Sequence, residues 1–193
     1  MAPDSTAGYR RDMGATTRTD GSVRVLIHAL DQAGDVLDHV HADDLPNPTP
    51  CDEWSVSALV DHLVATPARF LAQMRDEKVD WSAEAPHLEH GWGPEFRNHA
   101  DDLVHAWHEL EGAPPTPAQW QVAELAVHTW DLATAIGVTV EGLDPEVAET
   151  ALEFMHASLG PELRGEAFGP EQPAPPDAGP YARLAAFAGR ATG

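Results

Sequence analysis

The sequence predicts an all-α fold: an antiparallel four-helix bundle followed by additional short C-terminal helices. Apolar residues recur three and four positions apart in four long segments, which is the period of an amphipathic helix. Clusters of proline and glycine separate these segments, and no segment alternates with the period of a strand. Long amphipathic helices joined mostly by short links are typical of a bundle.

The chain of 193 residues divides into residues 1–19, expected to be a disordered lead, and residues 20–193, expected to be a single domain. The lead is rich in small polar residues, which bury too little surface to offset the entropy of ordering. It has no apolar core of the kind found in a secretory signal. The first helix is expected to begin at Asp20 or Ser22, and its apolar stripe is Val23, Leu26, Leu30, Ala33, Leu37 and Val40.

The second helix follows a proline-rich segment, residues 45–50, which cannot continue a helix because each proline removes a donor. Ser55 is the expected N-cap, and the helix is expected to run to about Glu77. Its core face is Val56, Leu59, Val60, Leu63, Phe70 and Met74. Residues 78–93 have no clean period and are expected to form a loop.

The remaining helices are predicted from the same kinds of signal. The third has one face made of Phe96, His99, Leu103, Trp107 and Leu110, and it ends at Gly112. The fourth is expected from Pro117 to Ile136, with Gly137 near its C-cap. Asp144 and Pro145 open a fifth helix as N-cap and first position. A short terminal helix is expected over residues 181–190.

Charge and cysteine content restrict the environment and the partners. The chain has 11 Lys and Arg against 32 Asp and Glu, a formal net charge of −21, so it repels phosphate backbones and anionic headgroups. No nucleic acid and no membrane partner is therefore expected, and no apolar run approaches the ~20 residues that span a bilayer. A single cysteine, Cys51, excludes an internal disulfide framework and fits a cytoplasmic location.

The fourth helix carries the sharpest chemical signal. Glu124, His128 and Asp131 fall within one narrow stripe, while most of the remaining circumference is apolar. A helix that is apolar nearly all round is usually buried, and a buried carboxylate must be paired, hydrogen-bonded or bound to metal. Side chains four apart lie next to each other, as a shared cation requires.

His62 on the second helix is the expected third metal ligand, because it borders the apolar face of that helix. Two histidines, one carboxylate and a water form the open pattern of catalytic zinc, although nickel and iron accept the same ligands. The predicted ligands are therefore His62, Glu124 and His128, with zinc or nickel as the first choices of divalent metal. The alternative is a side-chain hydrogen bond on a partly exposed helix.

Other polar and aromatic residues receive structural interpretations. Cys51 is expected to be a small residue packed at a helix entry, since the acidic residues after it disfavour a thiolate. Trp54 is interpreted as a hydrophobic anchor before the second helix. His99, His105 and His108 are interpreted as surface or seam residues. Asp131 could orient a ligating histidine, or it could pair with an arginine.

Two segments resemble a known family. Residues 48–56 (PTPCDEWSV) with 59–64 (LVDHLV), and residues 124–133 (ELAVHTWDLA), resemble the two signatures of the mycothiol-dependent maleylpyruvate isomerase metal-binding domain. That domain is a DinB-like four-helix bundle. The resemblance covers most of residues 20–190 and implies that His62, Glu124 and His128 bind the divalent metal.

The chain departs from the isomerase after residue 160, where the isomerase has a second domain that contributes a catalytic arginine. The resemblance is instead to a shorter, largely uncharacterised actinobacterial branch, so maleylpyruvate is not expected as the substrate. The partners implied are a small-molecule thiol, mycothiol in the family, and an unidentified small substrate, with a homodimer left open.

Two functional hypotheses follow. In the first, the chain is a metal-dependent isomerase or transferase that uses a thiol such as mycothiol, with no general base identifiable in the sequence. In the second, it is a non-catalytic metal-binding or stress-related bundle. An open coordination position favours the first, and a fourth protein ligand, from Asp131 or a histidine of the third helix, favours the second.

Overall fold

The computed structural model describes residues 6–52, 54–114, 116–160, 164 and 168–192. These residues form six α-helices and no strand; the single β-type contact among them is an isolated bridge between Pro48 and Ser55. The helices are α1 (Thr6–Leu37), α2 (Val56–Met74), α3 (Trp92–Glu109), α4 (Ala118–Ala135), α5 (Pro145–Ser158) and α6 (Pro180–Phe187), with 3-10 turns η1 (Ala42–Asp44) and η2 (Val140–Gly142). The prediction of an all-α bundle is confirmed.

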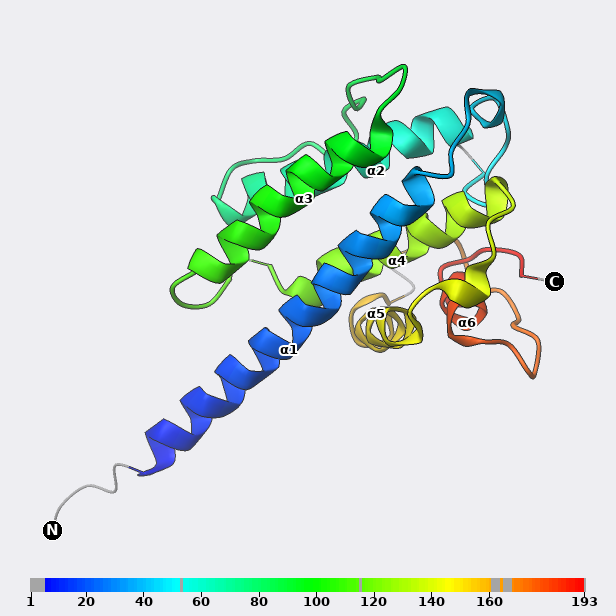
Figure 1. Cartoon of the computed structure of the whole chain (residues 1–193). Helices are drawn as coiled ribbons and strands as arrows, with labels where there is room; N and C mark the ends of the chain where they lie inside the picture. Colours follow the sequence, from blue (N-terminus) through cyan, green and yellow to red (C-terminus); the bar gives the residue numbers. More distant parts are fainter. Residues whose placement is uncertain (1–5, 53, 115, 161–163, 165–167, 193) are drawn as a thin grey trace, which may run out of the picture.

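The bundle consists of α1 to α4, and α4 is its most buried helix. It packs against α1 and α2 within the bundle and against α5 and α6 outside it. Every residue from 121 to 133 is buried, as the nearly continuous apolar circumference of this segment predicts. Figure 1 shows α5 end-on beside α4, so α5 crosses the direction of the bundle helices.

The helix directions differ from a simple antiparallel order. In Figure 1, α1 and α4 run one way, and α2 and α3 both run the other way. Side-chain contacts agree with this order, since Arg97 near the start of α3 binds Asp35 and Asp38 at the end of α1. Within the four-helix bundle, consecutive helices are therefore antiparallel except for α2 and α3, which are parallel.

The path of the segment between α2 and α3 explains this parallel pair. Arg69 Nη2 donates to the carbonyl oxygen of Ala83 at 2.7 Å. Further along, the Asp61 carboxylate accepts from the backbone N–H of Leu88 at 3.2 Å and lies 2.7 Å from His87 Nδ1. The segment thus returns along α2 toward the start of that helix, and α3 begins beside it. The predicted loop over residues 78–93 is in effect the crossover connection of the bundle.

The N-terminal end of α1 also differs from expectation. Helix α1 begins at Thr6, whereas the sequence predicts a disordered lead up to residue 19 and a cap at Asp20 or Ser22. No proline interrupts residues 6–37, and extending an existing helix costs far less than nucleating one. Figure 1 shows these first turns extending beyond the other helices. Residues 1–5 of the expected lead lie outside the described residues.

Several predicted helix ends are confirmed by their capping contacts. The Ser55 side chain accepts from the Ala58 N–H at the start of α2, and the Asp144 side chain accepts from the Glu146 N–H at the start of α5. Gly137 has a φ of +73° just after α4, a conformation that glycine adopts without strain. Helix α2 ends at Met74, slightly before the predicted Glu77. No helix in the described part of the chain is long and apolar enough to cross a bilayer.

Candidate metal centre

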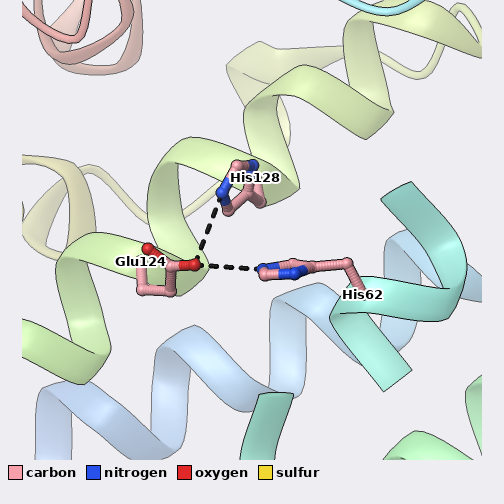
Figure 2. A group of neighbouring side chains, drawn as sticks. All are labelled: His62, Glu124 and His128. Atoms are coloured by element: carbon pink, nitrogen blue, oxygen red, sulfur yellow. Dashed lines mark hydrogen bonds and ion pairs between the residues drawn. The ribbon is translucent and has the colours of Figure 1, made fainter. Parts of the chain in front are cut away.

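Helices α2 and α4 bring His62, Glu124 and His128 together in the interior of the bundle. Figure 2 shows one carboxylate oxygen of Glu124 facing both imidazoles. Glu124 Oε1 lies 3.0 Å from His62 Nε2 and 3.5 Å from His128 Nε2. All three residues are buried, with 7%, 6% and 2% of their surfaces exposed, and their ligand atoms lie within 4.8 Å of one another.

The local sequence explains why these side chains converge. Glu124 and His128 are one helical turn apart on α4, so they project from the same side of the helix. Leu59 and Leu63 flank His62 on the buried side of α2, which turns its imidazole into the seam between the two helices. The contact between α2 and α4 brings all three groups together in the seam.

The charges in this seam are strongly coupled. Burial by itself raises the pKa of Glu124, but the neighbouring His128 and His62 outweigh it, so the pKa lies far below its ordinary range and Glu124 is ionised. Burial lowers the pKa of His128, but the Glu124 charge and the hydrogen bond to Asp131 raise it to about 9. Burial lowers the pKa of His62, and its contact with Glu124 opposes this only in part. His62 is therefore the neutral imidazole of the pair at pH 7.

Asp131 contacts both a histidine and an arginine, the two kinds of partner that the sequence suggested. Its Oδ2 lies 3.2 Å from His128 Nδ1, and the Arg190 guanidinium binds the same carboxylate through Nε and Nη2. Burial raises the pKa of Asp131, but hydrogen bonds from His128 and Arg190 lower it below its ordinary value, so the group is ionised and can only accept. The proton between the two residues therefore belongs to His128 Nδ1, which leaves His128 Nε2 facing Glu124.

Aromatic side chains surround the imidazoles, and sequence reasoning missed their role. The Trp54 ring centroid lies 4.5 Å from that of His62 and 5.2 Å from that of His128. Trp81, from the segment between α2 and α3, lies 6.3 Å from His62 and also packs on Phe70. Trp54 does anchor the entry to α2, as predicted, but it does so by packing on two candidate ligands. Its place within the first family signature, residues 48–56, was the signal that the sequence offered.

The remaining candidates occupy structural positions. Cys51 is buried in the turn before α2, where the Thr49 hydroxyl bonds to its backbone, as expected for a residue packed at a helix entry. His99 Nδ1 lies 2.9 Å from the Val64 carbonyl oxygen in the seam between α3 and α2, and His105 lies on the surface near Glu109. Neither these histidines nor His108 belong to a cluster of potential metal ligands among the residues that the structure describes.

The donor set can hold a metal ion. Two imidazole nitrogens and one carboxylate oxygen suit zinc and its neighbours in the transition series. Ligand atoms at about 2.0–2.2 Å from a tetrahedral ion are about 3.3–3.6 Å apart. The separations from Glu124 Oε1 to the two imidazoles, 3.0 and 3.5 Å, are close to this edge length. The buried His and Glu side chains therefore form a group that could bind a metal ion.

Comparison with known proteins gives one family relationship. The chain is 33% identical over 181 residues to the uncharacterised protein Rv0738 of Mycobacterium tuberculosis, and equally to its counterpart MT0763 in a second strain. The alignment covers 84% of this chain and 93% of the mycobacterial protein. No family model matches the chain, and no solved structure matches it either. The chain therefore belongs to the same family as the mycobacterial protein Rv0738.

Proposed function

We propose that the protein binds one divalent metal ion through His62, Glu124 and His128 and uses it in a thiol-dependent isomerisation or transfer reaction. The observation that carries the proposal is the convergence of three buried ligand atoms from two helices within 4.8 Å. The resemblance of residues 48–64 and 124–133 to the mycothiol-dependent enzymes supports the same ligands and suggests mycothiol as the thiol.

Burial of the ligands supports the metal. Placing a carboxylate and two imidazoles in a nonpolar seam costs free energy unless the groups satisfy one another or a cation. The Glu124–His62 and Glu124–His128 contacts satisfy one oxygen of the carboxylate, which is the atom that a shared ion would contact. His128 is further held by Asp131, an arrangement typical of histidines that bind metal.

Charge supports an anionic co-substrate. A metal that binds His128 would replace the proton on its Nε2, so both imidazoles would then be neutral. In that state Glu124 and Asp131 contribute two negative charges and Arg190 one positive charge. A divalent ion makes the total +1, so one monoanion, such as a thiolate, neutralises the buried site. A metal bound there would lower the pKa of an incoming thiol, which is about 8.5 for free cysteine, and so favour the nucleophilic thiolate.

The second candidate is a bundle in which the metal has a structural role. Its support is the enclosure of the ligands: each is less than a tenth exposed, and Trp54 packs on both imidazoles. An ion enclosed in this way would stabilise the contact between α2 and α4 without accepting a small molecule. The two candidates differ in whether a fourth coordination position is open to an added thiol.

The discriminating experiment uses cobalt-substituted protein. Elemental analysis after purification without added metal should first give one divalent ion per chain. Addition of mycothiol to the cobalt form should then change the visible spectrum, because sulfur enters the coordination shell. If neither mycothiol nor another small thiol at millimolar concentration changes the spectrum, the structural role takes the place of the enzymatic one.

Cys51→Ala provides the matched control for this experiment. Cys51 belongs to the turn before α2, and we expect its substitution to leave both the metal and the thiol-dependent spectral change in place. Glu124→Ala, in contrast, should abolish both. Loss of thiol-transfer activity in Cys51→Ala with the metal still bound would mean that the nucleophile is the protein's own cysteine.

A further inference from the structure

The C-terminal segment places a buried arginine next to the candidate metal centre. Arg190 lies just after α6 and is 4% exposed. Its Nε donates to Asp131 Oδ1 at 3.1 Å and its Nη2 donates to Asp131 Oδ2 at 3.0 Å. These two parallel hydrogen bonds match the planar fork of a guanidinium to the two oxygens of a carboxylate.

Asp131 connects this arginine to His128. The same oxygen that accepts from Arg190 Nη2 lies 3.2 Å from His128 Nδ1. Asp131 is completely buried, so no water-exposed conformation is available to its carboxylate. A contact to His128 alone would leave the carboxylate free to rotate about its last bond. The bidentate pair with Arg190 fixes its plane and, through Oδ2, the orientation of the imidazole.

The backbone around Arg190 is built to hold the arginine in this position. Gly189 has a φ of +92°, and a Cβ there would lie 2.7 Å from the backbone of Gly169. Only glycine can occupy position 189, because the backbone passes too close to Gly169 to leave room for a side chain. The turn after α6 is closed by a hydrogen bond from Arg190 N–H to the Ala185 carbonyl at 2.9 Å, and Arg190 Nη1 donates to the Ala188 carbonyl.

A second arginine anchors the same turn from outside. Arg164 Nη1 donates to the carbonyl oxygens of Gly169 at 2.7 Å and Phe187 at 2.8 Å. Its guanidinium also lies over the Phe187 ring, 4.6 Å from the ring centroid. The segment that carries Arg190 is therefore attached to the rest of the C-terminal region at several points.

We propose that Arg190 is a positioning residue of the metal centre: it fixes the Asp131 carboxylate, which in turn orients His128 for metal binding. The inference rests on the proposed function, because the metal is the ligand that a fixed His128 serves. It makes the C-terminal segment a part of the site, although none of the described residues of that segment belongs to the candidate ligand cluster. Outer partners of ligating histidines have this effect in metal sites generally.

The first test compares the cobalt affinity of the full-length protein with that of Arg190→Gln, measured by competition with a chelator. We expect the affinity to fall about 10–100-fold, the usual effect of losing an outer partner of a ligand. Arg190→Lys should recover part of the loss, since it keeps the charge without the two parallel hydrogen bonds. If Arg190→Gln does not fold, Arg190→Lys is compared with the unmodified protein instead, and we expect its cobalt affinity to fall by a smaller factor.

Tyr181→Phe is the matched control. It removes the buried hydrogen bond between Gln32 and Tyr181, so it weakens the packing of the same C-terminal helix without touching Asp131. We expect it to bind cobalt as tightly as the unmodified protein. An equal loss of affinity in Tyr181→Phe would show that any loosening of α6 has this effect, and it would overturn the positioning role.

A double-mutant cycle with Asp131→Asn tests the route of the effect. Because Arg190 acts through Asp131, Arg190→Gln should cause little further loss of cobalt affinity in the Asp131→Asn background. An equal loss in both backgrounds would contradict the proposal, since it would mean that Arg190 acts on the metal independently.

A measurement without metal separates this inference from the proposed function. In chelator-treated protein, the nitrogen and proton resonances of the His128 imidazole should shift in Arg190→Gln and stay unchanged in Tyr181→Phe. Absence of metal from the unmodified protein, together with the His128 shift, would refute the proposed function and leave the positioning intact. Unchanged His128 resonances in Arg190→Gln would refute the positioning whatever the metal content.

Discussion

Among the described residues, two clusters of histidine and carboxylate side chains are compact enough to hold a metal ion. They differ in the hydrogen bonds and ion pairs that their side chains already make. The buried cluster consists of His62, Glu124 and His128. The second consists of His28, Asp144 and Glu146 and is only partly buried. The residue types are alike, so composition and spacing alone do not separate a ligand set from an ordinary polar contact.

Every member of the second cluster has a structural partner. Asp144 caps α5 by accepting from the Glu146 N–H at 2.9 Å, and its Oδ2 lies 2.7 Å from His28 Nδ1. Glu146 forms an ion pair with Arg24. In the buried cluster, the same Glu124 oxygen faces both imidazoles, and neither imidazole caps a helix. The buried cluster is therefore the candidate metal centre, because its ligand atoms converge on one point and its imidazoles do not cap a helix.

The largest expected difference between the clusters is in metal content. His62→Ala or His128→Ala should remove most bound metal, because each leaves only two protein ligands. The loss of affinity should exceed the roughly 10–100-fold effect of removing an outer partner. His28→Ala should retain one ion per chain. Full metal content in both His62→Ala and His128→Ala, measured by elemental analysis, would show that the ligand assignment is wrong.

Removing the metal should lower the thermal stability of the protein, and this effect should depend on the buried cluster and not on the second one. An ion that binds only the folded protein stabilises it by about 2.7 kcal/mol at a free concentration 100 times Kd. For a chain of this size that corresponds to a rise in Tm of roughly 5–11 °C. Thermal unfolding with and without chelator should show this shift in the unmodified protein and in His28→Ala, but not in His128→Ala. An unchanged Tm after complete chelation would contradict a site that joins α2 to α4.

The smallest effect is expected at Asp144, and it should depend on pH rather than on metal. Burial raises the pKa of Asp144, but His28 and the Glu146 N–H lower it below its ordinary value. Its charge therefore stabilises the fold at pH values above the unfolded pKa, and this contribution is lost as the pH falls through the lower, folded value. Asp144→Ala should cost about 1 kcal/mol at pH 7 as a lost N-cap.

Asp144→Asn is the matched variant, since an asparagine side chain still caps a helix but carries no charge. Urea unfolding at pH 7 and pH 2 should show a difference in the free energy of unfolding between Asp144→Asn and the unmodified protein that is smaller at pH 2 than at pH 7. A difference of the same size at both pH values would mean that the charge of Asp144 contributes nothing to stability.

Local sequence determined the helices and two of the three residues of the candidate metal centre. The periods of apolar residues specify which face of each helix is buried, and the caps at Ser55 and Asp144 act within one turn of the chain. Glu124 and His128 are adjacent because any α-helix places residues four apart side by side. These features depend on interactions between near neighbours, so they can be derived from the order of residues.

Tertiary structure alone decided the rest. The parallel direction of α2 and α3 depends on the path of the connecting segment along α2, and no periodic pattern encodes that path. The packing of Trp54 on two imidazoles and the pairing of Arg190 with Asp131, 59 residues earlier, join parts of the chain with no local signal for each other. Such contacts form because a buried charge or ring takes the partner that the folded chain brings within reach.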